Sequence, residues 1–155
     1  MSMNTVPERL AALRAAMAAN GVAVYLIPVG DPHASEYLPC HYTSLTWFSG
    51  FHGENSNFVV TRTESALWAD GRYFVQAEKE IAGTEIKLQR MGEPGVPTVE
   101  EYCANALNEG EALGLCGLTA STALVNDLKK ALEKKGASIK TLNLEDELWT
   151  EGRPA

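Results

Sequence analysis

The sequence predicts one α/β domain with a mixed β-sheet of about six strands and helices on both faces. Short β-branched or aromatic runs alternate along the chain with segments of helical apolar spacing. Two of the runs, 58–61 and 66–70, are separated only by a short polar turn, which predicts an antiparallel hairpin in an otherwise parallel sheet. At 155 residues the chain is long enough to bury most of its apolar surface in one core.

The first expected element is a helix that begins after Thr5. Thr5 and Glu8 have the spacing of a capping box, and Pro7 falls in the first turn, where its missing N–H costs nothing. Asn20 and Gly21 are typical of a helix end. Between these signals the larger apolar residues recur at helical spacing among alanines: Leu10, Leu13 and Met17.

The strands are predicted from short apolar runs bounded by Gly, Pro or polar residues. Residues 22–28 are apolar throughout, as expected of a strand buried on both faces. Residues 30–56 have no clear period and are expected to form loops and short helix. The remaining strands are predicted at 58–61, 66–70, 86–91, 112–117 and 138–143.

Three further helices follow from capping signals and spacing. One is expected after Gly71 and extends toward Ile81. A second capping box, Thr98 with Glu101, begins a helix that runs to Leu107. The last helix has Ser121 as its expected cap, Gly136 at its end, and Leu124, Leu128 and Leu132 on its apolar face.

Composition excludes several classes of function. A net charge of −7 argues against a nucleic-acid surface, and we interpret Lys129, Lys130, Lys134 and Lys135 as a solvated helix face. No apolar run approaches the length of a membrane span, and the first residues do not resemble a signal peptide. The cysteines form no CxxC pair, which favours reduced thiols and a cytoplasmic location: Cys40, Cys103 and Cys116.

A self-contained catalytic site is not predicted. The histidines, His33, His41 and His52, form no HExxH motif, and we expect neither catalytic nor metal-binding residues in this chain. In the segment 31–36 the simpler interpretation is a helix cap made by Asp31 or Ser35. GxSxG, GxGxxG and P-loop motifs are also absent.

Two polar-aromatic segments are the best candidates for contacts. Residues 47–53 (WFSGFHG) and 68–74 (WADGRYF) contain aromatic, glycine and charged residues after or between predicted strands, where α/β folds place their contacts. A purely structural interpretation competes with this one. In it Trp47, Phe51 and Trp68 are core residues, Asp70 caps a helix and Arg72 pairs with a carboxylate.

These segments resemble the N-terminal domain of Xaa-Pro aminopeptidases, within the wider creatinase/prolidase N-terminal group of peptidase family M24. The resemblance rests on residues 10–14, 27–39 (IP-x-GDPHASEYLP), 47–53 and 67–81, and it resumes at 144–154. The segment DPHASEYLP is most similar to the longer, three-domain aminopeptidase P type. The resemblance implies a ribonuclease H-like topology over residues 1–149, with 150–155 as a linker or chain end and no catalytic pita-bread domain.

The family removes an N-terminal residue that precedes proline, using two divalent metal ions, manganese or zinc, held by two Asp, one His and two Glu of the C-terminal domain. The resemblance implies that this domain packs on the catalytic domain, helps to form a homodimer and borders the peptide entrance. Arg72 is the contact expected first, as a fixed cation for a carboxylate. Trp47, Phe48 and His52 are weaker candidates for the rim or interface.

The chain departs from the family pattern at two places. Residues 49–57 read SGFHGENSN where the family usually has SGF-[DT]-GS-[AG]-G, and 115–117 read LCG where the long type often has VDP. Two alternatives therefore stay open. One is a catalytically inactive peptide- or protein-binding module, as in the large subunit of the histone chaperone FACT. The other is the N-terminal domain of a prolidase or creatinase.

Overall fold

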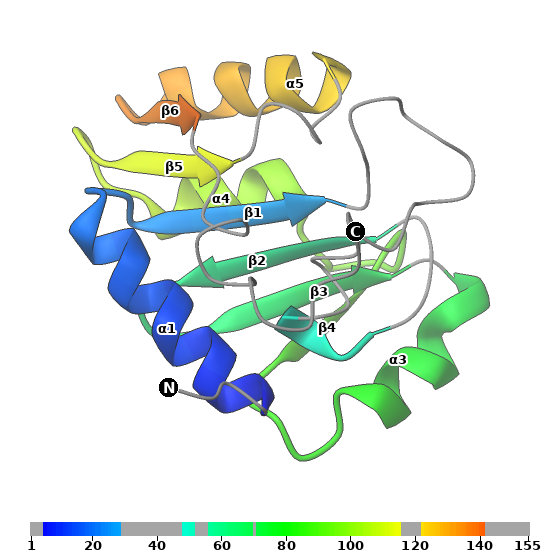
Figure 1. Cartoon of the computed structure of the whole chain (residues 1–155). Coiled ribbons are helices and arrows are strands. Elements are labelled where there is room, and N and C mark those ends of the chain that lie inside the picture. The colour runs from blue at the N-terminus through cyan, green and yellow to red at the C-terminus, as the bar shows by residue number, and fades with distance from the viewer. Residues whose placement is uncertain (1–4, 29–47, 52–55, 70, 116–121, 142–155) are drawn as a thin grey trace.

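The computed structural model describes residues 5–28, 48–51, 56–69, 71–115 and 122–141. Helices and strands alternate along these ranges, as the sequence predicts (Figure 1). In chain order the described elements are α1 (Val6–Ala19), β1 (Val24–Pro28), β2 (Asn57–Thr61), β3 (Ser65–Ala69), the 3₁₀ helix η2 (Gly71–Tyr73), α3 (Phe74–Glu80), β4 (Lys87–Arg90), α4 (Val99–Ala106), β5 (Ala112–Leu115), α5 (Thr122–Glu133) and β6 (Ser138–Thr141).

The sheet of the described region has six strands in the order β4-β3-β2-β1-β5-β6. Strand β2 is antiparallel to both β1 and β3, whereas β3–β4, β1–β5 and β5–β6 are parallel pairs. Five of the six described strands therefore point the same way, and the sixth, β2, runs in the opposite direction. This arrangement confirms the predicted α/β class, the mixed sheet and the β2–β3 hairpin.

Helix α1 begins and ends where its capping signals predict. The Thr5 hydroxyl accepts the Glu8 N–H at 3.4 Å and donates to the Glu8 carboxylate at 3.0 Å. At the other end Asn20 is the C-cap, and Gly21 has φ +72°, the left-handed conformation that favours glycine. Helix α4 has the equivalent cap, because the Thr98 hydroxyl accepts the Glu101 N–H at 3.2 Å.

Each face of the sheet has its own apolar core, and the strands alternate between the two. On β3, Leu67 and Ala69 belong to the first core and Ala66 and Trp68 to the second. The first core is covered by α1, α3 and the segment 48–51, and the second by α4 and α5. Trp68 is 1% exposed and donates its indole N–H to the Pro97 carbonyl at 2.9 Å, which confirms it as a core residue.

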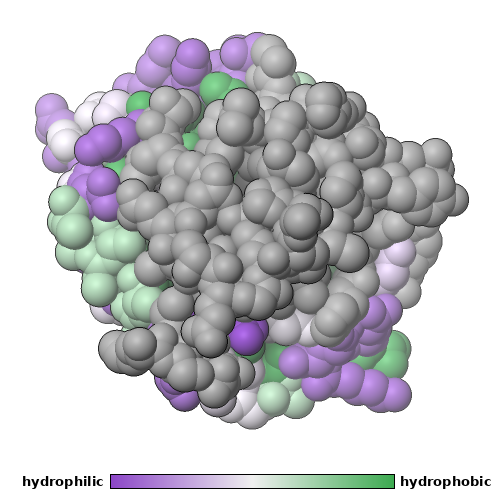
Figure 2. Space-filling view, in the orientation of Figure 1, coloured by the Kyte–Doolittle hydropathy of each residue, from purple (hydrophilic) through white to green (hydrophobic). Residues whose placement is uncertain are grey.

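The described surface of α5 is mostly polar, since its exposed residues are mainly Asn, Asp, Glu and Lys. Figure 2 shows hydrophilic residues at the top of the view, over α5, and a paler apolar strip at the left, over α1. All four lysines of the α5 region, Lys129, Lys130, Lys134 and Lys135, are exposed, which confirms a solvated helix face. In the part of the chain that the structure describes, no helix is long and apolar enough to cross a membrane.

Candidate functional site

The carboxyl ends of the parallel strands meet at one edge of the sheet, on the right of Figure 1. In α/β folds this edge is where loops make contact with ligands and partners. Of the two polar-aromatic segments singled out in the sequence, 71–74 follow the end of β3 at this edge. Residues 48–51 instead contribute Phe48 and Phe51 to the core on the first face of the sheet. The strand ends that form the edge are Pro28, Ala69, Arg90, Leu115 and Thr141.

The segment 48–51 is part of the core. Phe48, Ser49 and Phe51 are each 0% exposed. The Ser49 hydroxyl accepts the Phe51 N–H at 3.1 Å, which closes a local turn. Gly50 between them has φ +81°, a backbone conformation that L side chains rarely adopt. The serine and the glycine therefore set the turn that directs both phenylalanine rings inward.

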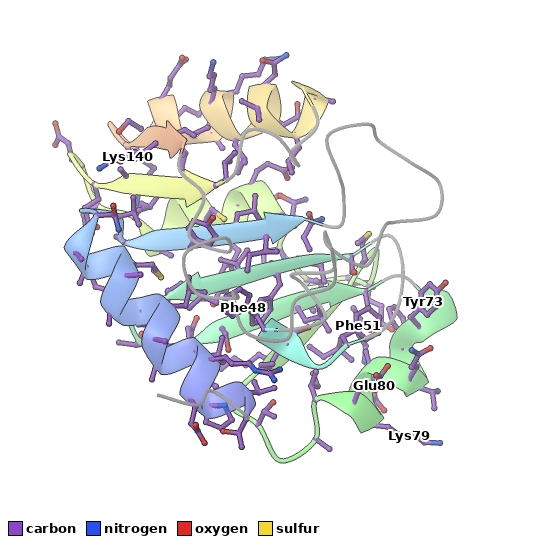
Figure 3. The ribbon with its side chains drawn as sticks, in the orientation of Figure 1. Phe48, Phe51, Tyr73, Lys79, Glu80 and Lys140 are labelled. Atoms are coloured by element: carbon purple, nitrogen blue, oxygen red, sulfur yellow. The ribbon has the colours of Figure 1, made fainter. Side chains whose placement is uncertain are left out.

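The segment 71–74 joins β3 to α3 through the 3₁₀ helix η2. Tyr73 lies against the buried Phe51, with ring centroids 6.0 Å apart and an interplanar angle of 86° (Figure 3). Such an edge-to-face pair is a favourable aromatic geometry. The next residue, Phe74, lies under the guanidinium of Arg90, whose central carbon is 5.6 Å from the ring centroid. The two candidate segments are thus in direct contact, although they are far apart in the sequence.

Of the site residues predicted from the sequence, some lie at the carboxyl-end edge, some are buried, and others fall outside the described residues. The backbone of Arg72 is the middle of η2, at the carboxyl-end edge. Phe48 is fully buried, so in this conformation its side chain is not accessible to a substrate or a partner. It would affect a substrate rim only by packing against the residues that form it. Trp47, His52 and Asp70 lie outside the described residues. Helix α3 itself begins after Tyr73, whose side chain makes no capping hydrogen bond.

The described residues offer neither a metal-binding group nor a reactive cysteine. In those ranges no three His, Cys, Asp or Glu side chains are grouped in a way that could hold a metal ion. All three histidines lie outside the ranges, so the prediction of no metal site in this chain stays a prediction. Cys103 is fully buried, and burial raises the pKa of its thiol well above its usual range, which disfavours the reactive thiolate.

The opposite edge of the sheet carries an ionic cluster that the sequence patterns did not reveal. Arg14 of α1 donates two hydrogen bonds to the Glu85 carboxylate, at 2.8 and 2.6 Å, and a third to the Thr61 carbonyl at 2.9 Å. Ser65 of β3 donates to the same carboxylate at 3.2 Å. The hydrogen bonds that Arg14 donates to Glu85 lower the pKa of Glu85 and raise the pKa of Arg14.

A second carboxylate, Glu64, lies at the same edge in the β2–β3 turn. It accepts Lys87 of β4 at 2.8 Å and the hydroxyl of Tyr102 on α4. The hydrogen bond from Lys87, and then the one from Tyr102, lowers the pKa of Glu64. Burial, and then the hydrogen bond to Glu64, raises the pKa of Tyr102 above its usual range. Through Arg14 and Tyr102 this edge ties helices of both faces to the sheet.

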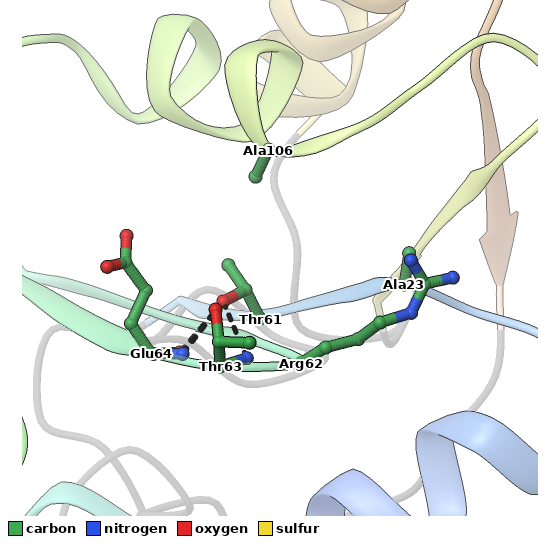
Figure 4. A pocket seen from close by; sticks show the side chains of 6 residues that line it. All are labelled: Ala23, Thr61, Arg62, Thr63, Glu64 and Ala106. Carbon is green, nitrogen blue, oxygen red and sulfur yellow. Dashed lines mark hydrogen bonds between the residues drawn. The ribbon is translucent and has the colours of Figure 1, made fainter.

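Between the β2–β3 turn and the end of α4 lies an open pocket of about 370 Å³ (Figure 4). Its polar groups are already paired within the chain. Arg62 forms an ion pair with Glu111 at 2.6 Å, and the Thr61 hydroxyl accepts the N–H groups of Thr63 and Glu64. A ligand would have to displace these partners, so the pocket is a weak candidate. Its lining consists of Ala23, Thr61, Arg62, Thr63, Glu64 and Ala106.

The described residues form an α/β framework, and the candidate contact residue lies at the carboxyl ends of its strands. Its polar networks bind helices to the sheet, and the backbone of Arg72, the candidate contact residue, lies in a short turn at the carboxyl-end edge. Within the described ranges the interior holds no charged side chain, since its buried polar residues are Ser49, Ser56, Thr61 and Ser65. Only a comparison with known proteins connects this scaffold to a chemical reaction.

The comparisons give one consistent result. Residues 9–148 match the Creatinase/Prolidase N-terminal domain family. Aminopeptidase P2 from Arabidopsis thaliana is 39% identical over 154 residues, which cover 96% of this chain and 22% of that protein. A probable Xaa-Pro aminopeptidase P from Sordaria macrospora is 38% identical, over 99% of this chain and 25% of that protein. The chain therefore spans about a quarter of the length of these curated relatives.

Solved structures agree with the sequence match. An X-prolyl aminopeptidase from Caenorhabditis elegans, described as a cytosolic enzyme with a di-nuclear active site, is 33% identical with a TM-score of 0.88, over 98% of this chain and 26% of that one. The N-terminal domain of the cytoplasmic peptidase PepQ from Mycobacterium tuberculosis is 25% identical with a TM-score of 0.63, over 90% of this chain and 95% of that one. The chain belongs to the creatinase/prolidase N-terminal domain family.

Proposed function

We propose that this chain acts as the non-catalytic N-terminal domain of a metal-dependent Xaa-Pro aminopeptidase, which removes the N-terminal residue that precedes proline. The observation that carries the proposal is the family match over residues 9–148, together with relatives named aminopeptidase P that are 38–39% identical over nearly the whole chain. Because the chain spans about a quarter of those relatives, the hydrolytic chemistry is assigned to the remainder of a longer protein.

The parent enzyme is proposed to use two divalent metal ions, manganese or zinc. The di-nuclear active site described for the Caenorhabditis elegans relative supports the number of ions. The described residues of this chain do not fit such a centre, because no group of three metal-ligating side chains occurs among them. We assign the ligands, two Asp, one His and two Glu, to a C-terminal catalytic domain, as the family resemblance implies. A cytoplasmic location is proposed by analogy with the same relative.

The contribution of this chain is proposed to be oligomerisation and the substrate entrance. Its partners would be the catalytic domain, a second copy in a homodimer and, at the rim, the peptide substrate. Arg72 is the leading contact, because its backbone lies in a short turn at the carboxyl-end edge and a guanidinium binds carboxylates with directional hydrogen bonds. Trp47 and His52 remain weaker proposals, and Phe48 would contribute only through its neighbours.

The proposal is tested by comparing this chain with the product of the full gene that encodes it. We expect the purified 155-residue chain with added Mn²⁺ to leave an Xaa-Pro peptide intact, and the longer protein to cleave it. A chelator should abolish the activity of the longer protein, and Mn²⁺ should restore it. Cleavage by the short chain at a rate that survives metal-site controls would refute the assignment of the chemistry to another domain.

The same experiment separates the alternatives. A longer protein without peptidase activity, whose sequence lacks the Asp, Asp, His, Glu and Glu ligands, would favour a binding module. Activity restricted to Xaa-Pro dipeptides would favour a prolidase, and hydrolysis of creatine a creatinase. The relatives named aminopeptidase P lead us to expect cleavage of longer peptides that begin with Xaa-Pro.

A further inference from the structure

Among the buried polar residues of the described ranges, Ser56 has a hydroxyl without a hydrogen-bond partner. The residue is 3% exposed, and its Oγ is covered by other atoms. The other three, Ser49, Thr61 and Ser65, each make at least one hydrogen bond through the hydroxyl. A buried hydroxyl without a partner costs stability, so such a group in a folded protein calls for an explanation.

Ser56 lies in the middle of the carboxyl-end edge of the sheet. At this edge the ladders of β2 with β1 and with β3 both reach as far as Asn57, which pairs with Pro28 and Trp68. Ser56 is the residue next to both ladders, between the carboxyl ends of two neighbouring strands (Figure 1). This edge is the part of an α/β fold that usually contacts ligands and partner domains.

The nearest described side chains on the same face of the strands are apolar. Side chains alternate between the faces along a strand, so Ser56 falls on the face of Phe58 and Val60, which belong to the first core. On β3 the residues of that face toward this edge are Leu67 and Ala69. A bound water needs about two to four polar partners, and these side chains would not supply them. A partner from outside the described chain explains the unpaired hydroxyl better than a buried water does.

We propose that the Ser56 hydroxyl bonds to a main-chain polar group of the catalytic domain when the two domains pack together in the full-length enzyme. The identity of this partner rests on the proposed function, which assigns the catalytic domain to the remainder of a longer protein. The chain spans about a quarter of the relatives named aminopeptidase P, so the remainder is large enough to cover the edge. The contact would give the hydroxyl the partner that the described chain does not supply.

The burial of the hydroxyl favours a permanent neighbour over a substrate. Its oxygen is covered in this chain, so any group that bonds to it must first displace part of the cover. A domain interface forms once, when the protein folds, whereas a substrate would have to displace the cover at every turnover. A main-chain N–H or C=O suits the site, because a hydroxyl can accept a hydrogen bond as well as donate one.

The first test asks whether the hydroxyl lacks a partner in this chain, and it uses the 155-residue chain alone. Thermal unfolding is compared in wild type, Ser56→Ala and the matched control Ser65→Ala. Both serines are buried, but the Ser65 hydroxyl donates to the Glu85 carboxylate at 3.2 Å. We expect Ser65→Ala to lower Tm by about 2–4 °C, and Ser56→Ala to leave Tm unchanged or raise it by about that amount.

The second test asks whether the hydroxyl gains a partner in the full-length protein. Amide hydrogen exchange of residues 56–58 is measured in the short chain and in the full-length protein, each as wild type and as Ser56→Ala. We expect these amides to exchange about tenfold more slowly in the full-length wild type, because the catalytic domain covers the edge. Ser56→Ala should remove about two- to tenfold of this protection, the range for one hydrogen bond. Ser65→Ala, at the opposite edge, should leave the ratio between the two proteins unchanged.

Three results would overturn the inference. A fall in Tm from Ser56→Ala equal to that from Ser65→Ala would show that the hydroxyl is already bonded within this chain. Equal protection in the full-length wild type and Ser56→Ala would show that no partner reaches it. Protection that appears only after an Xaa-Pro peptide is added would assign the hydroxyl to the substrate instead. A full-length protein without Xaa-Pro peptidase activity would refute the proposed function, whereas the exchange ratios would still support or overturn the contact between the domains.

Discussion

Replacement of Arg14 by methionine should destabilise this chain far more than the same change at Arg62. Both arginines pair with a glutamate at an N–O distance of 2.6 Å. Arg14, however, has only 22% of its side chain exposed and makes three hydrogen bonds, one of them to the Thr61 backbone. Arg62 is 65% exposed and forms a single contact with Glu111. Comparing the two variants therefore separates the stability that comes from burial and hydrogen bonding from the stability that comes from the ion pair alone.

The magnitude follows from these contacts. Hydrogen bonds to charged groups contribute about 1.5–3 kcal/mol when protected, whereas exposed ion pairs contribute about 0–1 kcal/mol. Since Glu85 is 36% exposed, we discount the upper value and expect Arg14→Met to cost about 2 kcal/mol. For a chain of this size that loss corresponds to a fall in Tm of about 4–8 °C. Arg62→Met should cost about 0.5 kcal/mol.

The free energy of unfolding is measured by urea denaturation followed by tryptophan fluorescence, with the m-value checked in every variant. An unchanged m-value means that the shift in midpoint reports stability rather than a change in the denatured state. A loss below about 0.5 kcal/mol for Arg14→Met would contradict the reasoning, given the range expected for a protected charged pair. Equal losses in the two variants would show that burial does not distinguish these ion pairs.

Two other predictions concern the carboxylates and the buried turn. The pKa values of Glu85 and Glu64 are lowered in the folded state, so both glutamates stabilise the fold above the unfolded pKa of about 4.3, and that contribution is lost as the pH falls through the lowered folded values. Urea titrations between pH 7 and pH 3 should therefore show a shallower acid loss in Glu85→Gln than in wild type, and equal slopes would contradict the lowered pKa of Glu85. Gly50→Ala should cost about 1 kcal/mol, because φ is +81° there even though the added Cβ would stay 3.7 Å from the Glu80 carbonyl oxygen. Gly71→Ala, where φ is ordinary and the space is open, is the control in the same urea assay, and an equal loss at both glycines would rule out backbone strain as the cause.

Local chemistry in the sequence was enough to predict the elements of the fold. A threonine followed three residues later by glutamate marks the start of α1 and α4, and both threonine hydroxyls accept the expected N–H. The short turn between 61 and 65 predicted the β2–β3 hairpin, which the register confirms. Such signals act within one or two turns of backbone, so they can be recognised without knowing what packs nearby.

The candidate site was predictable only in part. The two polar-aromatic segments were recognisable by their composition and by resemblance to a family, and described residues of the two are in contact through Phe51 and Tyr73. Their composition could not show that Phe48 points into the core rather than toward a partner, because aromatic residues serve both purposes. The ion pair of Arg14 with Glu85 was missed for a related reason: the partners are 71 residues apart, and neither stands out from other charged residues.

By itself the sequence predicted the order and approximate bounds of the described helices and strands, and the family to which the chain is similar. Only the tertiary structure decided the strand order, the contact of Tyr73 with Phe51, and the pairing of Glu64 with a tyrosine 38 residues away. The physical reason is the range of the interactions. Capping and periodicity depend on neighbours along the chain, whereas strand order and long-range contacts depend on how two apolar faces of one sheet are buried together, which no local pattern encodes.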